Sequence, residues 1–222
     1  MFDTARASTD SRDGIGLSIY RGGEPLVELD LGRVYDGSKC FALNAYMRQT
    51  LSGEAFRVSA LPSAALDPSS QTIAVAWVDG ERGCKASLFA GATNAQVKLV
   101  LVNGTDATKP RIVTRGADKA LPAVAYRDGR VLVGFQTRTF APADCVHNRK
   151  RVCLDYAYST SADDFATEHR LSDGSSNPYE QFDGAFIGDY SALAVGADGV
   201  AHAVWTDSRS GDQNLFGAGF RP

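Results

Sequence analysis

The chain has 222 residues, of which 44% are apolar and 22% are charged, and its formal net charge is -3. This length and apolar content suffice for one sizeable core, so we expect a single domain over residues 1–222. A net negative charge gives no general attraction for nucleic-acid phosphates or anionic lipid. No stretch approaches the roughly 18 apolar residues of a membrane span. We therefore expect neither a nucleic-acid partner nor a transmembrane segment.

The N-terminal part allows two interpretations. In the first, Ile15–Tyr20 and Leu26–Leu29 form a hairpin around Gly22 and Gly23. Cys40–Arg48 then forms a third strand, Phe56–Ser59 a fourth, and the first residues of the chain supply an outer strand to the last repeat unit. In the second interpretation, the chain begins inside a repeat unit, because Thr9–Gly14 closely echoes Thr206–Gly211. No signal peptide is expected in these residues, since Met1–Asp3 is neither basic nor followed by an apolar stretch.

Three later segments superimpose on one another, and the first two start 60 residues apart. Each has a short strand of small residues, a tight turn rich in Asp, Gly or Pro, and a second strand that ends in an aromatic residue, polar groups and an arginine. The three strand pairs are Leu61–Pro68 with Ile73–Arg82, Leu121–Gly129 with Val131–Arg138, and Tyr190–Val195 with Ala201–Arg209. The aromatic residues at the shared position are Trp77, Phe135 and Trp205, for which we expect core packing.

A third strand follows each hairpin, and Arg111–Thr114 is an example of a short fourth strand. The third strands are Lys98–Val102, Leu154–Tyr158 and Asn214–Ala218. Four-stranded units at this spacing predict an all-β protein of the β-propeller type, with about four blades visible. The blade-like units are roughly 1–59, 60–117, 118–184 and 185–222. They form either a complete small ring or the C-terminal part of a six-bladed propeller. A β-sandwich is disfavoured because it gives no reason for the same strand ending to recur.

Tyr158–Phe165 resembles a degenerate form of the Ser-x-Asp-x-Gly-x-Thr-Trp/Phe turn of the sialidase-like propellers, also called the BNR or Asp-box repeat superfamily. Val102–Thr108 and Arg48–Phe56 are weaker echoes of this turn. Phe186–Tyr190 followed by Ala203–Arg209 resembles the last blades of secreted bacterial members. The resemblance implies that Asp-box turns join the third and fourth strands, at the end away from the ligand, and are structural.

The candidate ligand-binding residues come from the ends of the repeats. Four arginines follow second-strand endings, and a propeller would gather them around one mouth, where they could hold a carboxylate such as that of sialic acid. They are Arg12, Arg82, Arg138 and Arg209. Asp10, Asp79 and Asp207 lie two or three residues from three of these arginines, so each pair could instead brace its own loop. Asp189 and Tyr190 begin an inner strand and either face the mouth or cap the strand.

The resemblance implies a tyrosine nucleophile assisted by a glutamate, a separate aspartate, and an arginine triad. The nearest candidates here are Tyr179, Glu180 and Asp183, for which a solvated connecting loop is the alternative. The family's Phe/Tyr-Arg-Ile-Pro motif is missing. We therefore expect a module that binds a glycan or an extracellular protein on its loop face without catalysis. The alternatives are an exo-sialidase-like glycoside hydrolase or its C-terminal portion, and a structural element completed by another chain or by oligomerisation.

The cysteines favour an oxidising compartment. Cys145 and Cys153 bracket a polar loop and are expected to form a disulfide, with Cys40 and Cys84 as a second candidate pair and free thiols as the alternative. This pattern indicates a secreted or periplasmic protein.

No cofactor or metal site is expected. Four loop carboxylates could offer oxygens to calcium, but they lack EF-hand-like spacing. They are Asp183, Asp189, Asp207 and Asp212.

Overall fold

The structure is a computed structural model that describes residues 2–4, 14–34, 42–43, 49–51, 54–58, 61–79, 95–116 and 118–222. Strands dominate these residues. The helical elements among them are three single turns of 3-10 helix, η1 (Ser161–Asp163), η2 (Pro178–Glu180) and η3 (Phe182–Gly184). None of the described helices is long and apolar enough to cross a membrane.

Most strands belong to four antiparallel sheets, which we number in chain order. The first sheet contains β1 (Phe2–Thr4), β2 (Gly14–Arg21) and β3 (Glu24–Arg33). The second contains β6 (Ser63–Asp67), β7 (Thr72–Asp79), β8 (Gln96–Asn103), β9 (Asp106–Ala107) and β10 (Arg111–Ile112). The third contains β11 (Lys119–Arg127), β12 (Arg130–Thr137), β15 (Asp155–Thr160) and β16 (His169–Arg170). The fourth contains β17 (Ala192–Val195), β18 (Ala201–Asp207) and β19 (Asn214–Phe220).

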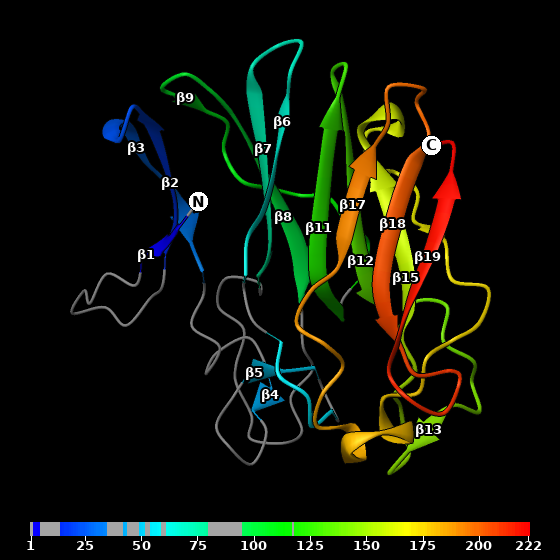
Figure 1. Ribbon diagram of the computed structural model, residues 1–222. Coiled ribbons are helices and arrows are strands. Elements are labelled where there is room, and N and C mark those ends of the chain that lie inside the picture. The colour runs from blue at the N-terminus through cyan, green and yellow to red at the C-terminus, as the bar shows by residue number, and fades with distance from the viewer. Residues whose placement is uncertain are drawn as a thin grey trace.

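The sheets stand side by side in chain order, with the first sheet at one end of the row and the fourth at the other (Figure 1). In the last three sheets the first strand is innermost, and β6, β11 and β17 contact one another in turn. This is how consecutive blades of a β-propeller pack. The prediction of an all-β chain built from repeated blade-like sheets is confirmed.

Buried apolar side chains fill the spaces between neighbouring sheets. Trp77 is 0% exposed and packs with Ile15 and Leu17 between the first and second sheets. Phe135, also 0% exposed, belongs to the core between the second and third sheets. Trp205 stacks on Tyr156 between the third and fourth sheets, with ring centroids 4.8 Å apart. The aromatic position of the repeat is therefore a packing position, as the sequence predicted.

The N-terminal part differs from the first sequence interpretation. The predicted third strand, Cys40–Arg48, contains only β4 (Ala42–Leu43) among the described residues, and β4 pairs with β5 (Gln49–Thr50) in a separate hairpin. Phe56 and Val58 lie outside the described strands, and their side chains fill the core between the second and third sheets.

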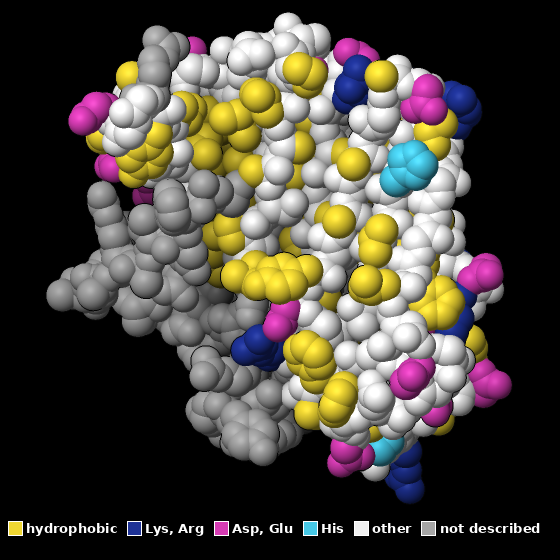
Figure 2. All heavy atoms as spheres, viewed as in Figure 1, with side chains coloured by type: hydrophobic (Ala, Val, Ile, Leu, Met, Phe, Trp, Pro, Cys, Tyr) yellow, Lys and Arg dark blue, Asp and Glu magenta, His cyan; other side chains and the backbone are white. Residues whose placement is uncertain are grey.

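The first residues do not complete the last sheet. Phe2–Thr4 pairs with β2, and the fourth sheet keeps three strands in the described part of the chain. Its outward surface exposes Val204 and Leu215, at 40% and 77%. Figure 2 shows hydrophobic side chains spread among polar ones over the face that the sheets present in this view.

The Asp-box-like segment lies where the resemblance implied, between the third and fourth strands of the third sheet. β15 ends at Thr160, whose hydroxyl accepts a hydrogen bond from the amide of Ala162 at the start of η1. Phe165 turns back into the core with 7% exposure, and β16 follows. This turn anchors one end of the third sheet, and the loops that follow β12 and β18 lie at the other end.

Candidate functional site

The loops between strands collect at one end of the sheets, which we call the loop end. It carries residues 138–154 after β12, residues 171–191 before β17 and residues 208–213 after β18. In Figure 1 the arrowheads of β11 and β17 point away from this end, so the inner strands begin there. Loops held by a rigid scaffold are where binding residues usually lie.

A groove of about 240 Å³ opens at the loop end, where the three inner strands begin. Its walls come from equivalent positions of the three sequence repeats. The lining residues are Leu61, Pro62, Ser63, Leu121, Pro122, Asp189, Tyr190 and Ser191. The starts of the three inner strands therefore all contribute to one opening.

A β-bulge shapes the middle wall of the groove. The pairing between β11 and β12 shifts between Ala120 and Ala123, which leaves Leu121 and Pro122 outside the ladder. Leu121 adopts a left-handed backbone with φ of 47°, which is strained for a residue with a bulky side chain. The hydroxyl of Ser191 donates to the Leu121 carbonyl at 2.6 Å and holds the bulge in place.

Tyr190 and Asp189 supply the aromatic and the charged groups of the groove. Tyr190 is 79% exposed, so its ring is available to a ligand. Asp189 forms an ion pair with Arg57 at 2.8 Å, and the two side chains are 31% and 52% exposed. The hydrogen bond to Asp189 and its charge raise the pKa of Arg57. For Asp189 and Tyr190 the sequence left two roles open, facing the mouth or capping the strand, and both residues line the groove.

Arg138 is held by carboxylates. Its guanidinium lies 3.1 Å from Glu54 and 3.8 Å from Asp118, and its side chain is 11% exposed. Both arginine and glutamate are therefore largely removed from solvent.

Arg209 is held in the same way, by Asp207 and Asp173. Asp207 also accepts a hydrogen bond from the indole of Trp205 at 3.1 Å. Burial alone would raise the pKa of Asp207, but its hydrogen bonds with Arg209 and the indole hold that pKa below its usual value. The surroundings of Arg138 and Arg209 favour the loop-bracing interpretation over a shared carboxylate grip.

The three catalytic candidates differ in their surroundings. The half-buried Tyr179 stacks on His147 with ring centroids 3.7 Å apart. Burial and the nearby Glu54 raise the pKa of Tyr179, which opposes the ionisation that a nucleophile needs. Glu180 accepts a hydrogen bond from the Asn177 side chain at 3.1 Å, and Asp183 is exposed in a left-handed turn with φ of 52°.

Glu54 is the most perturbed acid of the loop end. Its side chain is fully buried, and burial raises its pKa to about 8 although Arg138 opposes the rise. Neither carboxylate oxygen has a hydrogen-bond partner in the described part of the chain. In the sequence, Glu54 appears only within Arg48–Phe56, a weak echo of the Asp-box turn that assigns it no functional role.

Cys145 and Cys153 form the expected disulfide across the loop after β12, with Cα atoms 5.8 Å apart. Between them, β13 (Val146–His147) pairs with β14 (Lys150–Arg151) in a short hairpin. The other predicted pair, Cys40 and Cys84, lies outside the described residues, as do Arg12 and Arg82.

Three of the four loop carboxylates considered for calcium have separate partners, and the fourth, Asp183, is exposed. Asp189 pairs with Arg57, Asp207 with Arg209, and Asp212 accepts a hydrogen bond from the side-chain amide of Asn214. No group of three or more His, Cys, Asp or Glu side chains that could hold a metal ion occurs in the part of the chain that the structure describes.

The sequence reasoning missed several residues of the loop end. Pro62 and Pro122 belong to the first strands of two repeat copies and were not among the candidate residues, but both line the groove. Arg57 lies in the expected strand Phe56–Ser59 and Glu54 in the echo Arg48–Phe56, and neither pattern indicates a functional contact.

No family model matches this chain, and no curated protein is detectably similar in sequence. Solved structures with a related arrangement include a Hadza microbial sialidase, at 15% identity and a TM-score of 0.45, with 93% of this chain and 38% of that one covered. A family 117 glycoside hydrolase from the marine bacterium Zobellia galactanivorans matches at 10% identity and a TM-score of 0.41, covering 83% of this chain and 57% of that one. A GH43 endo-arabinanase from Bacillus licheniformis matches at 15% identity and a TM-score of 0.37, covering 96% and 66%. The chain thus spans well under two thirds of the length of the first two.

Proposed function

We propose that this chain is a carbohydrate-binding module that holds a sugar in the groove at the start of the inner strands and does not cleave it. The proposal rests on Tyr190, a residue that is 79% exposed. Tyr190 lines the groove together with Pro62 and Pro122. A sugar ring has an apolar C–H face and a rim of hydroxyls. An exposed aromatic face next to a few polar groups suits such a ligand.

The polar groups of the groove support this assignment. Asp189 can accept hydrogen bonds from sugar hydroxyls, and its ion pair with Arg57 holds the carboxylate at the groove. At about 240 Å³ the groove is smaller than the pockets of about 300–1,000 Å³ that hold drug-sized ligands. It therefore fits one sugar unit better than a long oligosaccharide.

The number and the pairing of carboxylates in the groove support a role without catalysis. Most glycoside hydrolases place two carboxyl groups on either side of the scissile bond. Among the residues that line the groove, Asp189 is the one carboxylate, and it is paired with Arg57. Tyr179, the candidate nucleophile, stacks on His147 and has a raised pKa.

The disulfide supports a location in an oxidising compartment. A bond between Cys145 and Cys153 persists outside the cytosol and is rare inside it. We therefore place the proposed binding activity in the secreted or periplasmic fraction. Fractionation of producing cells checks this placement.

The binding is tested by titrating the protein with a panel of neutral and acidic oligosaccharides in a calorimeter. Tyr190→Ala should weaken the affinity by about tenfold or more, because it removes the aromatic platform. Tyr20→Ala is the matched control, since Tyr20 is 50% exposed on the distant first sheet. Equal losses of affinity in the two variants, or the absence of any binding, would refute the groove as the sugar-binding site. Release of a fluorophore from a sialoside or another glycoside by this chain would refute the non-catalytic assignment.

A further inference from the structure

A rigid hairpin projects from the loop end. β13 and β14 pair Val146 with Arg151 and His147 with Lys150. The two turn residues, Asn148 and Arg149, both have positive φ, at 49° and 65°, as in the tight turns that match the twist of a hairpin. The Cys145–Cys153 disulfide closes the base of the hairpin. Such a short hairpin is marginal by itself, so the disulfide keeps it in one conformation.

Two arginines on this hairpin lack counter-charges. Arg149 and Arg151 are both exposed, and neither forms an ion pair with another residue that the structure describes. Arg138, by contrast, is bound by Glu54 and Asp118. Among the residues that the structure describes at the loop end, Arg149 and Arg151 are thus exposed guanidiniums without an ion pair, whereas Arg138 and Arg209 are paired.

The hairpin is fixed to the same end as the groove. The ring of His147 stacks on Tyr179 in η2, with an angle of 11° between the ring planes. η2 belongs to the segment that leads through η3 to Asp189 and Tyr190. Figure 1 shows β13 beside this segment, and in Figure 2 a Lys or Arg side chain projects into solvent at that end, next to a histidine.

We propose that Arg149 and Arg151 form an anion-binding subsite for the glycan, so that the ligand of this protein is an oligosaccharide bearing sulfate or carboxylate groups. This inference rests on the proposed function, which it extends from a sugar to an acidic sugar polymer. A guanidinium offers parallel N–H donors that match the oxygens of either anion. The net charge of -3 gives no general attraction for polyanions, so binding must come from this local arrangement.

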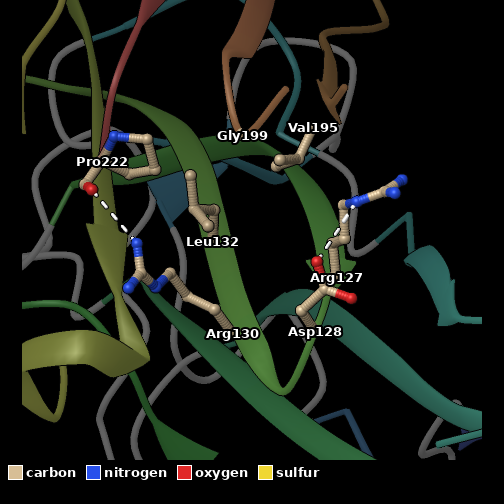
Figure 3. A pocket seen from close by; sticks show the side chains of 7 residues that line it. All are labelled: Arg127, Asp128, Arg130, Leu132, Val195, Gly199 and Pro222. Atoms are coloured by element: carbon tan, nitrogen blue, oxygen red, sulfur yellow. Dashed lines mark hydrogen bonds and ion pairs between the residues drawn. The ribbon is translucent and has the colours of Figure 1, made fainter. Parts of the chain in front are cut away.

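The molecule contains a matched control for charge. Arg127 and Arg130 flank the tight turn of the β11–β12 hairpin, at the end opposite the loop end. Figure 3 shows them around a cavity of about 230 Å³, where Arg127 pairs with Asp128 and Arg130 donates to the Pro222 carbonyl. Replacing both changes the net charge by the same amount as replacing Arg149 and Arg151.

The experiment titrates four probes into the intact protein at one ionic strength. They are a heparin-derived sulfated oligosaccharide, an oligogalacturonate, a neutral maltohexaose, and a short DNA duplex of similar charge. We expect at least one acidic sugar to bind more tightly than the neutral one. Arg149→Gln/Arg151→Gln should weaken that binding by about tenfold or more, whereas Arg127→Gln/Arg130→Gln should change it by less than about twofold. Comparing the sulfated oligosaccharide with the oligogalacturonate identifies which anion the site binds.

Other outcomes separate this inference from the proposed function. If maltohexaose binds as tightly as both acidic sugars and its binding requires Tyr190, the groove is supported as the sugar-binding site and the anion subsite is refuted. If the two double variants lose affinity equally, or if the DNA duplex binds as well as the sugars, the attraction is unspecific and the subsite is again refuted. Absence of binding to every sugar refutes both proposals. Circular dichroism and the melting temperature establish that each variant is folded.

Discussion

The carboxylate of Asp67, at the end of β6, accepts a hydrogen bond from the backbone amide of Gly129 at 3.0 Å. Gly129 lies in the turn between β11 and β12, so this contact ties the second sheet to the third at the end opposite the loops. Asp67 also accepts from the amide of Asp128 at 3.1 Å and from its own turn through Ser69 and Ser70. One buried side chain thus organises two neighbouring turns.

Asp67→Asn is expected to lower the melting temperature by several degrees, because an amide cannot accept all of these hydrogen bonds. Burial alone would raise the pKa of Asp67, but the hydrogen bonds from Gly129 and Ser69 hold it below its usual value. The stability that Asp67 contributes is therefore present above the unfolded-state pKa of 3.8 and is lost as the pH falls below it. Thermal melts between pH 2 and pH 7 measure this loss. Asp106→Asn, in the exposed strand β9, is the control and should leave the acid profile unchanged.

Glu168→Ala is expected to destabilise the protein by about 3–5 kcal/mol, because it leaves a buried lysine charge without its partner. Lys119 and Glu168 lie 2.8 Å apart, with side chains 0% and 5% exposed. The Lys119 ammonium also donates to Thr137 at 2.8 Å and to Thr139 at 2.9 Å. Urea unfolding measures the loss. The double variant Lys119→Met/Glu168→Leu should lose much less, and equal losses in the two would contradict a dominant role for the unpaired charge.

Stability should fall as the pH rises from about 5 to about 8, and Glu54 is the expected cause. Its pKa is raised from 4.5 to about 8 by burial, so the folded state holds a proton that the unfolded state releases over this range. The slope attributable to Glu54 is at most about 1.4 kcal/mol per pH unit. Glu54→Gln mimics the protonated form and should remove this part of the pH dependence. An unchanged profile in that variant, measured by urea unfolding at several pH values, would show that Glu54 is ionised in the folded protein.

Gly134→Ala is expected to cost about 1–3 kcal/mol through overpacking. A Cβ atom at Gly134 would lie 2.4 Å from the hydroxyl of Tyr156 on the neighbouring strand. Tyr156 is 0% exposed and stacks on Trp205, so it has little room to move. Tyr156→Phe removes the obstructing oxygen, and the double variant should recover most of the loss. A double-mutant cycle on melting temperatures tests this, and additive losses would argue against the contact.

The repeat could be predicted from the sequence because it consists of local patterns. Turn residues such as Asp128 and Gly129 and the small side chains of the inner strands recur in each copy, and each pattern specifies a hairpin with few tertiary contacts. The aromatic position was also readable, since Trp77, Phe135 and Trp205 are all buried between sheets. The N-terminal region was less predictable because Phe56 and Val58 are apolar for a reason that no local period reveals. They fill a space between two sheets that are distant in sequence.

At the loop end, too, some residues could be predicted from the sequence and others could not. From the sequence, Asp189 and Tyr190 could either face the mouth or cap the strand, and the folded chain brings both to the groove. The sequence also made Arg138 and Arg209 candidates for the mouth, but the number of carboxylates around each arginine depends on loops that meet only in the folded chain. Glu54 reaches Arg138 from 84 positions earlier, and Asp173 reaches Arg209 from another loop.

The sequence alone determined that this protein is built from repeated β-hairpins and that the aromatic position of each repeat is buried. Those features depend on neighbours a few residues away, which a single sequence displays. Only the tertiary structure decided which of the described arginines have an acidic partner. That pairing arises from long-range contacts, which bring Glu54 to Arg138 and leave Arg149 and Arg151 without an ion pair among the residues that the structure describes.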